Sequence, residues 1–61
     1  MTADVAELRQ RLTDALALAE SMRERTAERS VPRMALVDLC ADLRAAETHL
    51  RWFVDAERSE P

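Results

Sequence analysis

Ser30-Val31-Pro32 is the one strong helix-interrupting signal in this chain, and it lies near the middle of the 61 residues. Serine is a preferred N-cap, and proline is tolerated in the first turn of a helix because its missing N–H would be unpaired there. The sequence therefore predicts a single domain with a first helix over about 3–29, a turn over about 30–32, a second helix over about 32–57 and a frayed polar tail over 58–61.

The apolar pattern on both sides of this signal predicts helices that pack on each other. The chain has no glycine, and glycine costs about 1 kcal/mol relative to alanine inside a helix. Small and apolar residues recur at alternating steps of three and four, which is typical of a coiled-coil seam. The predicted seam is Val5, Leu8, Leu12, Ala15, Ala19, Met22 and Thr26, followed by Leu36, Leu39, Leu43, Ala46, Leu50 and Phe53. The expected fold is all-α, an antiparallel two-helix hairpin with Leu12 opposite Leu50.

The small size of the chain favours self-association. Chains of about 60 residues bury only about 60% of their unfolded surface and usually need a disulfide, a metal or a partner. A single cysteine excludes an internal disulfide. The seam also leaves Leu16, Leu18, Cys40 and Val54 uncovered, and we expect these residues to form a dimer interface. Two hairpins would then pack as a four-helix bundle.

The charges predict the direction of that homodimer. Arginines crowd the turn end at Arg23, Arg25, Arg29 and Arg33, whereas acidic residues gather at the opposite end, although the net charge is only −3. An antiparallel homodimer would place each basic turn beside the acidic end of its partner. The preference is small, since exposed ion pairs contribute about 0–1 kcal/mol each.

Three apolar residues of the second helix are candidates for binding a different protein. Trp52 lies off the predicted seam, and tryptophan is enriched among binding hot spots. Val37 and Met34 extend the strip along the helix. The alternative for Trp52 is that the second hairpin covers it.

The residues that usually carry catalysis or bind metals are poorly placed here. Cys40 and His49 are nine residues apart on one helix, which turns them to opposite sides. Glu47-Thr48-His49 lacks the Glu-x-x-His spacing of di-metal bundles. We therefore expect no enzymatic activity, no catalytic or metal site and no cofactor.

The arginine-rich turn end makes nucleic-acid binding an alternative, because arginine suits bidentate phosphate contacts. The negative net charge and the lack of aromatic residues in this segment weigh against it. The plan of a short acidic hairpin that dimerises resembles that of the plasmid copy-control protein Rop, an RNA-binding dimer. This resemblance covers size and hairpin plan, and it implies RNA binding.

The leading expectation is a non-enzymatic protein–protein interaction module, such as an adaptor, inhibitor or accessory subunit. A purely structural assembly element is a third alternative. No apolar stretch is long enough for a membrane span or signal peptide, so we expect a cytoplasmic protein that does not bind membranes. Lysine, asparagine, isoleucine and tyrosine are absent, which favours a GC-rich genome such as that of an actinobacterium or one of its phages.

Overall fold

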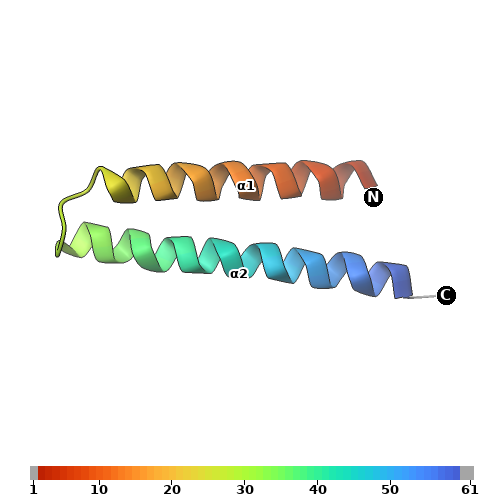
Figure 1. The fold of residues 1–61 in the computed structure, drawn as a ribbon. Coiled ribbons are helices and arrows are strands. Elements are labelled where there is room, and N and C mark those ends of the chain that lie inside the picture. The colour runs from red at the N-terminus through yellow and green to blue at the C-terminus, as the bar shows by residue number, and fades with distance from the viewer. Residues whose placement is uncertain (1, 60–61) are drawn as a thin grey trace.

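A computed structural model describes residues 2–59 as two helices joined by a short turn. Helix α1 spans Thr2–Glu24 and helix α2 spans Val31–Ser59. The helices run side by side in opposite directions, so both chain ends lie at the same end of the molecule (Figure 1). The described residues form no strand, and the molecule is a single layer of about 50 × 16 × 10 Å. The predicted all-helical hairpin is confirmed.

The start of α2 follows the predicted capping chemistry. The backbone N–H of Arg33 donates to Ser30 Oγ over 3.2 Å, and the N–H of Met34 donates to the Ser30 carbonyl over 3.1 Å. Ser30 is thus the N-cap, with Pro32 in the first turn. An N-cap serine satisfies a backbone donor that has no partner within the helix.

Helix α1 ends at Glu24, earlier than the predicted residue 29. The Thr26 hydroxyl donates to the Met22 carbonyl over 2.6 Å, and the Thr26 N–H donates to the Arg23 carbonyl over 3.2 Å. These bonds tighten the last turn of α1. Arg29 then adopts a left-handed backbone conformation with φ of 59°, and a right-handed helix cannot continue through such a residue. Residues 25–30 therefore form the turn. At the other end of the chain, α2 extends to Ser59, and residues 60–61 of the predicted tail lie outside the described residues.

Arg33 ties the two helices together at the turn. Its guanidinium Nη1 donates to the carbonyls of Arg23 and Thr26, over 3.0 and 3.1 Å. The last carbonyls of a helix have no internal partner, and a cation is favourable beside them. Arg33 therefore caps the C-terminus of α1 from the first turn of α2.

The core is a narrow seam between the helices, and it differs from the predicted one. Among the side chains of residues 3–59, only Ala19 and Cys40 are fully buried, with 4% and 0% exposed. The half-buried apolar residues around them are Val5, Leu12, Leu16, Leu36, Leu43, Ala46, Leu50 and Val54. The steps of three and four are kept, but the seam passes through Cys40 and Val54 rather than Leu39 and Phe53.

Leu8, Met22, Leu39 and Phe53 were therefore wrongly assigned to the seam, since each is 43–48% exposed. Ala15, also predicted in the seam, is exposed as well. Each helix carries two neighbouring apolar stripes, and periodicity alone does not say which stripe faces the other helix. Small residues at Ala19 and Cys40 allow the helices to approach closely along the stripe that the hairpin uses. Leu8, Met22, Leu39 and Phe53 lie on the stripe beside it.

Candidate interaction surface

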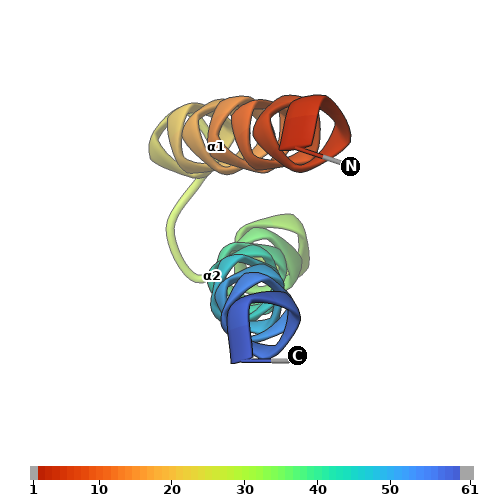
Figure 2. The ribbon, with the colours of Figure 1, turned by 90° about the vertical axis from the view of Figure 1, so that its right-hand side faces the viewer.

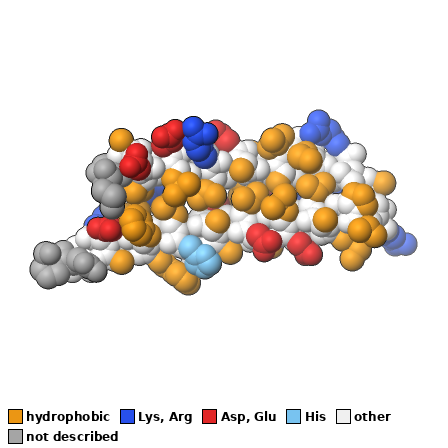
Figure 3. Space-filling model, turned by 180° about the vertical axis from the view of Figure 1, so that it is seen from behind, with side chains coloured by type: hydrophobic (Ala, Val, Ile, Leu, Met, Phe, Trp, Pro, Cys, Tyr) orange, Lys and Arg blue, Asp and Glu red, His pale blue; other side chains and the backbone are white. Residues whose placement is uncertain are grey.

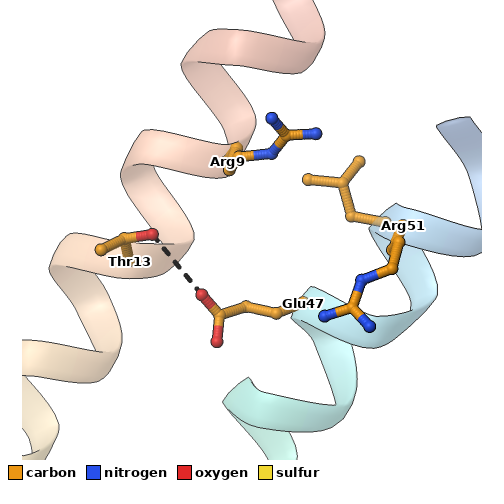
Figure 4. A pocket seen from close by; sticks show the side chains of 5 residues that line it. Arg9, Thr13, Glu47 and Arg51 are labelled. Atoms are coloured by element: carbon orange, nitrogen blue, oxygen red, sulfur yellow. Dashed lines mark hydrogen bonds between the residues drawn. The ribbon is translucent and has the colours of Figure 1, made fainter.

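One broad face of the hairpin is polar and is linked across the two helices. The Thr13 hydroxyl lies 3.5 Å from the Glu47 carboxylate, and the Arg44 guanidinium donates to Glu20 over 2.6 Å. Figure 4 shows Arg9 from α1 and Arg51 from α2 on the same side of the Thr13–Glu47 contact, where these residues line a shallow pocket with Leu50. This polar face is well suited to water.

The opposite face of the hairpin is apolar. A shallow groove between the helices is lined there by Asp4, Val5, Leu8, Leu12, Ala46, His49, Leu50 and Phe53. Figure 3 shows hydrophobic side chains in a band that runs over both helices. Helical spacing places exposed Met22 in line with Leu8, and exposed Leu39 in line with Phe53, so the band extends beyond the groove. We define the apolar face by Leu8, Ala15, Met22, Leu39, Ala46 and Phe53.

The solvent-accessible surface of the chain is large for a protein of its mass. The chain exposes 4961 Å², whereas the size scaling of monomeric proteins gives about 4,000 Å² for a mass of 6.9 kDa. The difference follows from the single-layer shape, because each helix is covered on one side only (Figure 2). Large contiguous apolar patches on such a surface mark sites of interaction.

The hairpin itself covers most of the residues that the sequence pointed to as a dimer interface. Cys40 is fully buried, and Leu16 and Val54 are half-buried along the same seam. The expectation that the hairpin leaves these three residues uncovered is therefore wrong. Leu18 is 60% exposed, as expected, and its place in a dimer interface stays a prediction.

Two of the three candidates for binding another protein, Trp52 and Met34, lie on the side of α2 that faces away from α1, and Val37 lies on its flank. Trp52 and Met34 are 62% and 63% exposed, and Val37 is 44% exposed. The Trp52 ring packs against the His49 ring, with centroids 5.2 Å apart at 44°. Trp52 and Met34 share one side of the helix but are separated by about 27 Å at 1.5 Å per residue. Exposed Val31, which the sequence did not single out, lies near Met34.

The arginines at the turn end have different surroundings. Arg33 is partly buried by its capping bonds, and Arg23 is also half-buried. The Arg25 Nε donates to the Ser21 carbonyl over 3.3 Å, while the side chain of Arg29 is exposed. Of these four arginines, Arg25 and Arg29 are therefore the exposed ones.

The structure separates the two residues considered for nucleophilic chemistry. Cys40 lies inside the seam, whereas His49 lines the groove of the apolar face and contacts Trp52. Within residues 2–59, no group of three His, Cys, Asp or Glu side chains is arranged to hold a metal ion. Neither helix in this part of the chain has the length and apolar content needed to cross a membrane.

No protein-family model matches this chain, and neither curated proteins nor solved structures show significant similarity to it.

Proposed function

We propose that this chain is a small, non-enzymatic protein–protein interaction module that acts as a dimeric helical hairpin in the cytoplasm. The observation that supports this function is the apolar face, which runs along both helices and has no covering element in the hairpin. Burying apolar surface yields about 25 cal/mol per Å². A face of this extent therefore favours association strongly.

A role as an adaptor, inhibitor or accessory subunit further requires a surface for a different protein. Trp52 supports such a role because it is exposed and lies on the side of α2 away from α1. Its indole ring is held against His49, so less conformational entropy is lost when a partner binds. This surface would stay accessible when the apolar face is covered.

The experiment for this role compares the wild-type chain with Trp52→Ala in affinity purification from the native cell, followed by titration of the purified partner. We expect Trp52→Ala to weaken partner binding at least tenfold while helix content and dimerisation are unchanged. Arg51→Ala, an exposed neighbour on the polar face, serves as the matched control. Unchanged partner binding by Trp52→Ala would contradict the role of Trp52, and a monomeric Trp52→Ala would assign the tryptophan to the bundle.

A nucleic-acid-binding regulator of Rop-like plan is the second candidate function, and the exposed side chains of Arg25 and Arg29 favour it. Binding would depend steeply on salt, because phosphate contacts release counterions. A gel shift that disappears in the Arg25→Ala, Arg29→Ala double variant would support this function over the first. We expect no shift, because the net charge is −3 and Arg33 is used to cap α1.

A further inference from the structure

The apolar face has the same pattern of side-chain sizes on both helices. On α1, Leu8 and Met22 lie seven residues before and after Ala15, and on α2, Leu39 and Phe53 lie seven residues before and after Ala46. Seven residues are about two helical turns, or about 10.5 Å. Each helix therefore presents a small residue between two large exposed ones.

The two small residues lie at the same height along the hairpin. The Thr13–Glu47 contact lies on one side of this level, and the Glu20–Arg44 ion pair lies on the other. Ala15 is between the α1 members of these pairs, and Ala46 is between the α2 members. A line across the apolar face from Ala15 to Ala46 thus divides it into two halves of similar composition.

We propose that a second copy of the chain covers the apolar face, related to the first by a two-fold axis that runs along this line. This inference rests on the proposed function and specifies its geometry. Helix α1 packs antiparallel on α1 of the second copy, and α2 packs antiparallel on its α2. Leu8 then meets Met22 of the second copy, Leu39 meets its Phe53, and the alanines let the helices approach closely at the axis.

The area available supports one further copy as the occupant. The chain exposes 4961 Å², about 1,000 Å² more than a compact monomer of its size. Standard interfaces bury about 800 Å² on each partner. A single second hairpin would therefore remove the excess.

The apolar spacing fits both directions of the second copy, and the charges select one. In the antiparallel direction, Asp4 lies beside Arg25 of the second copy, and Asp42 lies beside its His49. With both turns at the same end, α1 would instead face α2 of the second copy, which places Asp4 beside Glu57 and brings two arginine-rich turns together. Because like charges in contact destabilise an interface, the antiparallel direction is favoured.

Disulfide cross-linking in a Cys40→Ala background tests this geometry. We expect chains carrying Ala15→Cys alone, or Ala46→Cys alone, to form a disulfide-linked dimer, because each residue lies next to its own copy at the axis. Leu8→Cys alone should cross-link poorly, whereas a mixture of Leu8→Cys and Met22→Cys chains should cross-link well. Circular dichroism and sedimentation before oxidation check that each variant is folded and associated.

Other cross-linking patterns overturn the inference in recognisable ways. If Ala15→Cys cross-links only when mixed with Ala46→Cys chains, the turns of both copies lie at the same end of the dimer. The proposed two-fold axis along the line from Ala15 to Ala46 is then wrong. A dimer in which none of these positions cross-links uses another face, and the proposed dimeric module survives without this geometry. A wild-type chain that stays monomeric contradicts both proposals.

A charge exchange gives a second test that introduces no cysteine. Arg25→Asp should raise the dimer Kd about twofold to thirtyfold at low salt, since two symmetry-related exposed ion pairs are lost. Adding Asp4→Arg in the same chain should restore the affinity, because the two charges are exchanged across the interface. Failure of the double variant to recover would contradict the pairing of Asp4 with Arg25.

Discussion

The two broad faces of the hairpin differ in whether their side chains find partners on the other helix. On the polar face, Thr13 bonds to Glu47 and Glu20 pairs with Arg44, so polar groups of the two helices satisfy each other. On the apolar face, large side chains such as Leu39 and Phe53 remain 44% exposed. The hairpin thus pairs polar groups of the two helices across one face and leaves large apolar side chains exposed on the other.

The largest effect is expected from placing a charge on the apolar face. Leu39→Asp should raise the dimer Kd about 100-fold or more, because each of two symmetry-related sites loses about 1.5–3 kcal/mol of burial. Dilution calorimetry measures the change. Met34→Asp is the matched control, because Met34 is a more exposed apolar residue of the same helix but lies away from the apolar face. If both substitutions raised the dimer Kd equally, the proposal that the dimer forms through the apolar face would be contradicted.

A smaller effect is expected from overpacking the seam between the two faces. Ala19→Leu should lower the free energy of unfolding by about 1–3 kcal/mol, because Ala19 is buried where the helices approach closely. Urea denaturation followed by circular dichroism, at one fixed protein concentration, measures it. Ala17→Leu, at an exposed position two residues earlier, should change stability by less than about 0.5 kcal/mol. A tolerated Ala19→Leu would place the seam elsewhere.

The smallest effect is expected on the polar face. A double-mutant cycle with Glu20→Gln and Arg44→Gln should give a coupling of about 0.2–1 kcal/mol that decreases with added salt, because both side chains are partly exposed. The dimer Kd should be unchanged in all three variants. A clear change in Kd would show that the polar face takes part in association.

The fold was predictable from sequence because its signals are local. Ser30 and Pro32 mark the start of α2, and the alternation of three- and four-residue steps predicts that the helices pack on each other. The short turn between them makes this packing antiparallel. The end of α1 was missed because it depends on the Thr26 bonds, on the left-handed backbone at Arg29 and on a contact with the other helix. In this contact Arg33 caps the carbonyls of Arg23 and Thr26. Such a bond between helices leaves no periodic pattern in the sequence.

The apolar face could be predicted only in part. The sequence shows that each helix has more apolar residues than a single seam can cover, and this excess is present in the structure. It does not show which stripe is covered, because Cys40 and Leu39 are neighbours and both fit the spacing. Close packing at Ala19 and Cys40 decides the question, and packing between two helices is a tertiary property.

The most direct test is sedimentation equilibrium of the unmodified chain over a range of micromolar concentrations. The account predicts a molar mass that rises to twice the 6.9 kDa of one chain, because a second copy covers the apolar face. A mass that stays at 6.9 kDa over the whole range would contradict it.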